Sequence, residues 1–170
     1  VRDYGVDGFR IDTARHVNAE FWQAFGPAIR AAARAAGRPG FIQFGEVYND
    51  TLDIPLLSEF STHMPLDTTL DFAFFVAARN FVSRGGTAEA LTDLFQRDDL
   101  YTDHDSNIHT TTTFLGNHDA GRFAYFLRED NPGLPEAQAA DLVKLGHGLL
   151  FLVRGQPILY YGDEQGMIGR

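Results

Sequence analysis

The sequence has no cysteine, so disulfide bonds and thiolate metal sites are excluded. Basic residues are few: 14 lysines and arginines stand against 23 aspartates and glutamates, and the net charge of -9 disfavours a nucleic acid or an anionic membrane as partner. No apolar run reaches the length that spans a membrane. The chain begins at Val1 without an initiating Met or a signal peptide, so we expect a piece of a longer protein.

Three short apolar runs that each stop at a carboxylate are the most informative feature that is present. They end at Asp12, Glu46 and Asp119, in a chain whose 170 residues are 44% hydrophobic and suffice for one core. The separations are 34 and 73 residues. A β/α unit takes more than about 30 residues, so this spacing indicates one unit and then two more. We therefore expect three acids at the same ends of parallel strands, where α/β enzymes hold their chemistry.

The remaining pattern predicts further elements, and no repeat or linker divides them. Strands are expected at residues 8–11, 41–45, 70–74, 110–115 and 157–161. Helices are expected from a cap at Asn18 to Gly37 with a kink or break at Gly26-Pro27, from about residue 75 to Ser83, from a cap at Thr87 to Phe95, and from Pro135 to about Arg154. Residues 48–68 and 98–109 are expected to be loops.

This order, β-α-β-loop-β-α-α-β-α-β, predicts an α/β fold with parallel connections. A closed (β/α)8 barrel needs about 250 residues. We therefore interpret residues 1–170 as one fragment of a barrel domain, about strands four to eight with their helices. Strands that lose their neighbours become exposed edges, so we expect the isolated chain to self-associate or to be marginally stable.

The acids have chemically distinct neighbours. Arg10 and Asp12 are two residues apart in a strand and face the same side, where the guanidinium keeps the carboxylate ionised, as a nucleophile requires. Glu46 follows an apolar run, a setting that suits a carboxyl group to proton donation. Two such acids on adjacent strands can flank a glycosidic bond, with carboxyl groups about 5–5.5 Å apart in a retaining mechanism. Asp119 is then expected to bind hydroxyls or to stabilise positive charge on the sugar ring.

Two other interpretations remain open at this point. A strand-end aspartate often caps a helix or forms a structural ion pair, and His118 alone is more often a packing or surface residue. Asp12, Glu46, His118 and Asp119 could also ligate a divalent ion. No compact ligand motif such as H-E-x-x-H is present, and Arg10 beside the site disfavours a cation.

The segment Gly8-Phe-Arg-Ile-Asp-Thr-Ala-Arg-His-Val17 resembles the strand-four motif of the α-amylase family of glycoside hydrolases, family 13. Phe44-Gly-Glu46, Leu115-Gly-Asn-His-Asp119 and Gln156-Pro-Ile-Leu-Tyr-Tyr-Gly-Asp-Glu164 resemble the motifs of strands five, seven and eight. The resemblance implies the following roles: nucleophile Asp12 with its partner Arg10, general acid/base Glu46, transition-state stabiliser Asp119, sugar-binding residues His118 and Asn117, and acceptor-side residues Arg15 and His16.

The function implied by the resemblance is that of a retaining α-glycoside hydrolase or transglycosylase acting on α-glucans. The alternative is a non-catalytic relative of the family that serves as a binding or interaction module, which the presence of all three acids disfavours. The family's strand-three motif has no counterpart here, so the fragment alone is expected to be inactive. No metal site is carried over and no cofactor is required for the chemistry. Calcium is possible in the full-length protein, with the carbonyl group of His16 as one ligand.

Overall fold

The computed structural model describes residues 1–169. It contains the strands β1 (Gly8–Ile11), β2 (Ile42–Gly45), β3 (Thr68–Thr69), β4 (Thr112–Phe114) and β5 (Gln156–Ile158). Its helices are α1 (Ala19–Ala35), α2 (Ile54–Thr62), α3 (Phe72–Ala78), α4 (Glu89–Phe95), α5 (Phe123–Asp130) and α6 (Glu136–Leu152). A π-helical segment, Arg79–Ser83, extends α3.

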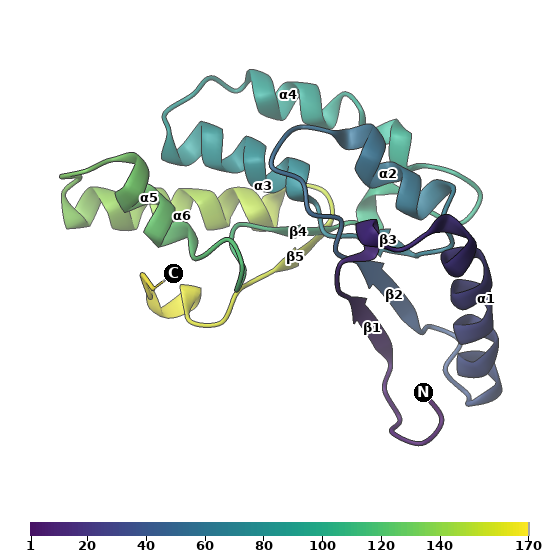
Figure 1. The fold of residues 1–170 in the computed structure, drawn as a ribbon. Helices are drawn as coiled ribbons and strands as arrows, with labels where there is room; N and C mark the ends of the chain where they lie inside the picture. The colour runs from purple at the N-terminus through teal and green to yellow at the C-terminus, as the bar shows by residue number, and fades with distance from the viewer. Residues whose placement is uncertain (170) are drawn as a thin grey trace.

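The strands are parallel and follow one another in chain order. β2 pairs with β1 on one side and β3 on the other, and β4 pairs with β5. A parallel bridge between Leu70 and Thr112 joins the two groups. Figure 1 shows the helices in an arc along one side of these strands. The expected α/β fold with parallel strands is confirmed.

The main core lies between β3, β4 and the helices that pack on them. Its largest fully buried side chains include Phe72 and Phe74 of α3, Phe114 of β4 and Phe123 of α5. The Phe72 and Phe114 rings meet edge to face, with centroids 5.0 Å apart. Such packing anchors the carboxyl end of β4, and so the loop that carries Asp119.

Two expectations around β3 are wrong. The strand is Thr68–Thr69 rather than residues 70–74, and α3 begins at Phe72 because Asp71 caps it, with Oδ1 accepting from the backbone N–H of Phe74 at 2.9 Å. The expected loop at residues 48–68 contains α2. Its N-terminus is capped by Asp53, which accepts from the N–H of Leu56 at 3.2 Å, with Pro55 in the first turn.

The helices differ from expectation in three further places. α1 continues through Pro27 because tertiary contacts hold this turn: the carbonyl of Gly26 accepts from Gln43 Nε2 at 3.2 Å, and a Cβ at Gly26 would lie 2.4 Å from the Pro65 carbonyl oxygen. Ala88, not Thr87, is the cap residue of α4. α5 was not expected, since residues 123–130 follow the strand-end motif with no separate start signal.

The shorter elements also need correction. β4 and β5 are shorter than the strands expected at 110–115 and 157–161. The expected loop at 98–109 contains two 3-10 turns and buries Tyr101. In contrast, α6 runs from Glu136 to Leu152, which confirms the long helix expected after Pro135. Within residues 1–169, no helix is long and apolar enough to cross a membrane.

Candidate active site

Asp12 and Glu46 leave neighbouring strands at the same end. Arg10 is level with Phe44, and Ile11 is level with Gly45 in the β1–β2 pair. The backbone N–H of Glu46 donates to the carbonyl of Ile11 at 2.8 Å, which continues the parallel pairing beyond β2. The two acids therefore follow their strands in matched register, because the strands are parallel and adjacent.

Arg10 binds both acids. Its Nη1 donates to Asp12 Oδ1, and its Nη2 donates to Glu46 Oε1 at 2.8 Å. The sequence suggested Arg10 as the partner of Asp12, but did not indicate the second bond. A planar guanidinium can serve two carboxylates at once because its N–H groups form a rigid fork. One cation is thus hydrogen-bonded to both acids.

Thr13 supplies the other donor to Glu46. Its backbone N–H donates to Glu46 Oε2 at 3.2 Å. Thr13 has a φ of 48° and is the one non-glycine residue with positive φ in the described part of the chain. This conformation is strained for a β-branched residue. The strained turn directs an N–H toward Glu46, and no local pattern in the sequence predicts it.

The two acids differ in exposure. The Asp12 side chain is 66% exposed, whereas that of Glu46 is 8% exposed. The hydrogen bond from Arg10 holds the pKa of Asp12 below its ordinary value, so this carboxyl group is an accessible anion. Glu46 accepts hydrogen bonds at both oxygens from Arg10 and Thr13. Each oxygen keeps a second lone pair, so these two hydrogen bonds leave room for a proton on Glu46.

Asp119 lies on a tight loop five residues beyond β4. Backbone hydrogen bonds between Asn117 and Gly121 close this loop, at 2.9 and 3.2 Å. The side-chain oxygen of Asn117 accepts from the N–H groups of Asp119 and Ala120 at 3.0 and 2.7 Å. Asn117 therefore uses its acceptor to shape the loop, and its amide NH2 group is the part available for a ligand.

His118 and Asp119 point toward solvent from this loop. His118 Nε2 lies 3.3 Å from Asp119 Oδ2, and the two side chains are 60% and 57% exposed. They line different hollows. His118, Asn117, Arg10 and Tyr160 border a cavity of about 230 Å³, whereas Asp119 borders an adjacent one of about 460 Å³. The structure thus gathers Arg10, Asn117 and His118 around one cavity and places Asp119 on its neighbour.

Arg15 and His16 lie in a 3-10 turn just beyond Asp12. Arg15 Nη1 donates to the backbone carbonyl of Tyr48 at 3.0 Å, which ties this turn to the loop after β2. Tyr48 also lines the larger cavity. Arg15 and His16 are both exposed. Sequence reasoning missed Tyr48 and Tyr160 as cavity residues, although each lies within four residues of a strand end.

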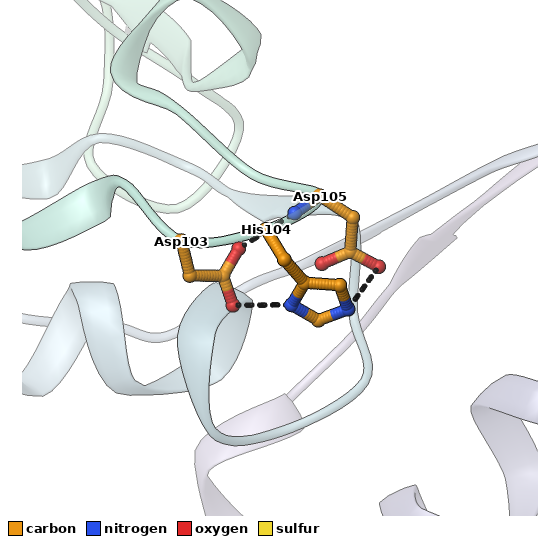
Figure 2. Close-up of side chains that lie close together, drawn as sticks. All are labelled: Asp103, His104 and Asp105. Atoms are coloured by element: carbon orange, nitrogen blue, oxygen red, sulfur yellow. Dashed lines mark hydrogen bonds and ion pairs between the residues drawn. The ribbon is translucent and has the colours of Figure 1, made fainter.

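A divalent-metal site at the acids is not supported by the geometry. In the described residues, one group of His, Asp and Glu ligand atoms lies within 4.8 Å of one another, and it is Asp103, His104 and Asp105. Figure 2 shows the His104 ring between the two carboxylates, 3.6 Å from each. Asp103 caps its own turn, because it accepts from the N–H groups of Asp105 and Ser106. The hydrogen bonds from the N–H of Asp105 and from the hydroxyl of Ser106 lower the pKa of Asp103 to about 2.

Comparison with known proteins agrees with this architecture. The model of the α-amylase catalytic domain family matches residues 1–170. The chain is 45% identical to an α-amylase of Streptomyces lividans over 169 residues, which covers 99% of this chain and 18% of that protein. It is 31% identical to a cyclomaltodextrin glucanotransferase of Klebsiella oxytoca, covering 95% of this chain and 27% of that protein. The crystal structure of an Anoxybacillus α-amylase superposes with a TM-score of 0.77 at 28% identity, covering 95% of this chain and 32% of that one.

Parallel strands with acids at their carboxyl ends are typical of α/β enzyme domains. The chain belongs to the α-amylase family, whose catalytic domain it matches in part. It spans between about a fifth and a third of the length of the relatives described above.

Proposed function

We propose that the chain is part of the catalytic domain of a retaining α-glycoside hydrolase or transglycosylase that acts on α-glucans. Its five strands correspond, in this proposal, to about strands four to eight of a (β/α)8 barrel. The observation that carries the proposal is the bridge from Arg10 to both Asp12 and Glu46, which puts two carboxylates of different exposure at one end of adjacent strands. The names of the relatives, an amylase and a glucanotransferase, support the substrate class.

In the first half of the reaction, Asp12 attacks the anomeric carbon and forms a glycosyl ester, while the glycosidic bond breaks. Glu46 gives a proton to the departing oxygen. In the second half, Glu46 takes a proton from water or from a sugar hydroxyl, whose oxygen displaces Asp12 with a second inversion. The anomeric configuration is therefore retained.

The other residues bind and orient the sugar in this proposal. His118 and Asn117 line the smaller cavity and suit hydrogen bonds to hydroxyl groups. Asp119 stabilises the positive charge that develops on the ring. Arg15 and His16 lie beside the acids on the turn after β1, where an acceptor sugar would enter. Whether water or sugar takes the glycosyl group is decided by acceptor contacts of the full-length protein.

We derive no step through a metal ion. Calcium takes about six to eight oxygen ligands. The one compact ligand group in the described residues includes the ring of His104 and lies in a separate loop. A calcium ion in the full-length protein would need ligands other than this group, with the His16 carbonyl as one contribution.

The second candidate is a non-catalytic relative that binds glucans. It requires no ionised nucleophile, whereas Arg10 maintains one at Asp12 through their hydrogen bond. The bridge to Glu46 likewise has no evident role in binding alone. The catalytic proposal therefore accounts for more of the structure.

The stereochemistry and the covalent intermediate test the proposal in the full-length protein. NMR of the first-formed product from a maltooligosaccharide should show the α-anomer before mutarotation. Mass spectrometry of the protein trapped with a slow-turnover glycosyl fluoride should show a glycosyl adduct on Asp12, which Asp12→Asn abolishes. A β-anomer, or an adduct that survives in Asp12→Asn, would refute the assigned mechanism. Binding without turnover in the wild type would support the second candidate.

A further inference from the structure

The end of β5 is fastened to the loop that carries the sugar-binding residues. Arg122 closes that loop and is the N-terminal cap residue of α5. Its Nη1 donates to the backbone carbonyl of Tyr161 and lies 3.2 Å from Asp163 Oδ1. The side chains of Arg122 and Asp163 are 7% and 4% exposed. Removing one partner of a buried ion pair destabilises the fold, because the charge of the other partner is left in a buried position with weaker pairing.

The same guanidinium lies against two aromatic rings. Its central carbon is 4.5 Å from the ring centre of Tyr160 and 4.8 Å from that of Tyr161. The two rings meet edge to face at 4.8 Å. Tyr160 in turn borders the 230 Å³ cavity together with Arg10, Asn117 and His118. The Arg122 guanidinium therefore contacts the ring of Tyr160, which lines the cavity, and the backbone carbonyl of Tyr161, the next residue along the chain.

The loop at residues 116–121, which carries His118 and Asp119, is closed tightly at its ends. A Cβ at Gly116 would lie 2.4 Å from the carbonyl oxygen of Gly121, so the two ends of the loop touch. Asn117 and Gly121 are joined by two backbone hydrogen bonds. A displacement of Arg122 is consequently passed to His118 and Asp119, because the short closed loop between them moves as a unit.

We propose that Arg122, with Asp163, is a positioning residue for the reaction: it sets the placement of the His118–Asp119 loop relative to Tyr160. This inference rests on the proposed function. Arg122 does not touch the sugar in this proposal and acts through the residues that do. A misplacement of about 1 Å in such a site can cost roughly a hundredfold in rate. A lysine retains the charge but cannot contact the Tyr161 carbonyl, Asp163 and both rings together.

Arg122→Lys in the full-length enzyme tests this inference, with Arg154→Lys as the matched control. Arg154 is also buried and paired, to Asp71 at 2.5 Å and Asp98 at 3.0 Å, and lies 5.3 Å from the centre of the Phe95 ring. It precedes β5 rather than following it. Well below both melting temperatures, Arg122→Lys should lower kcat on a maltooligosaccharide roughly tenfold to a hundredfold with KM within about threefold. Arg154→Lys should lower the melting temperature and leave kcat within about twofold.

A double-mutant cycle with His118→Ala separates positioning from general destabilisation. If Arg122 acts through the loop, its loss should cost much less in the His118→Ala background than in the wild type. Additive effects, or a kcat unchanged by Arg122→Lys, would overturn the inference. If Arg122→Lys does not fold, Asp163→Asn replaces it, with His147→Gln as its control, because Asp163 Oδ2 also lies 3.8 Å from His147 Nε2. A wild-type enzyme without activity on any α-glucan would instead refute the proposed function.

Discussion

Arg10 donates from Nη2 to Glu46 Oε1 at 2.8 Å and so joins the side chains of two neighbouring parallel strands. The register of β1 and β2 makes this contact possible, because it pairs Arg10 with Phe44, two residues before Glu46. The same guanidinium binds Asp12. A substitution at Arg10 therefore removes a hydrogen bond from each of the two carboxylates.

Glu46→Gln is expected to lower turnover most for substrates with poor leaving groups. A glutamine cannot protonate the departing oxygen, so turnover of a natural α-glucan should fall roughly a hundredfold or more. An aryl glycoside with an acidic phenol needs little protonation and should lose much less in the first step. Burst kinetics on both substrates measure this difference, with Asp12→Asn as the control that abolishes both. Equal losses on the two substrates would contradict the acid/base role of Glu46.

Arg10→Gln should shift the acid side of the pH profile. Asp12 has to be ionised to attack, and the hydrogen bond from Arg10 lowers its pKa. Without that cation the pKa of Asp12 rises, so the acid limb of kcat/KM should move to higher pH. Activity at the optimum should also fall roughly tenfold or more, as expected for losing hydrogen bonds to charged groups. A pH profile whose acid limb stays in place would show that Arg10 does not control the nucleophile.

Asp130→Asn should change how stability depends on pH. Hydrogen bonds from Arg79, at 2.8 and 2.9 Å, and from Ser83, at 2.7 Å, hold the pKa of Asp130 at about 2, against an ordinary value of 3.8. Because the folded-state pKa is the lower one, the stabilisation is complete above about pH 4 and is lost as the pH falls toward 2.

Urea unfolding checks this at both ends of the range. The variant should be less stable by roughly 1–2 kcal/mol at pH 7 and lose less stability than the wild type between pH 4 and pH 2. Asp141→Asn is the matched control, since its ion pair with Lys144 is exposed and should be worth a few tenths of a kcal/mol, about the size of ordinary surface pairs. Parallel pH curves for the wild type and Asp130→Asn would contradict the assigned role.

The 170-residue chain by itself is expected to self-associate and to show little glycosidase activity. β1 and β5 lie at the two ends of the strand series, each with one paired neighbour among the described residues. Near β5 the side chains of Leu152, Phe151 and Tyr161 are apolar and 87%, 56% and 70% exposed. Free strand edges beside exposed apolar groups favour pairing with another chain.

Light scattering over a range of concentrations measures this association. The double variant Phe151→Gln with Leu152→Gln should reduce it, because it removes apolar area without touching a core position. A monodisperse monomer with strong starch hydrolysis would show that the free edges matter less than we infer.

Local patterns were sufficient for the ends of β1 and β2 and for the acids that follow them. Asp12 and Glu46 could be placed at strand ends from the sequence, because the signal, an apolar run followed by an acid, lies within a few consecutive residues. α6 could be predicted for the same reason. The expected strand at 70–74 failed because an apolar run of that length suits a buried helix as well as a strand. The cap at Asp71 decided between them.

The sequence by itself was sufficient for the resemblance to the family, and β-α-β connections of more than about 30 residues predicted parallel strands, since motifs and apolar runs are local along the chain. Only the tertiary structure decided that Arg10 serves Glu46 as well as Asp12, that Thr13 adopts a positive φ to donate to Glu46, and that Asp119 and His118 border different cavities. It likewise decided that Arg122 fastens the β4 loop to the end of β5. These contacts join residues that lie up to 41 positions apart, and their geometry follows from strand register and packing.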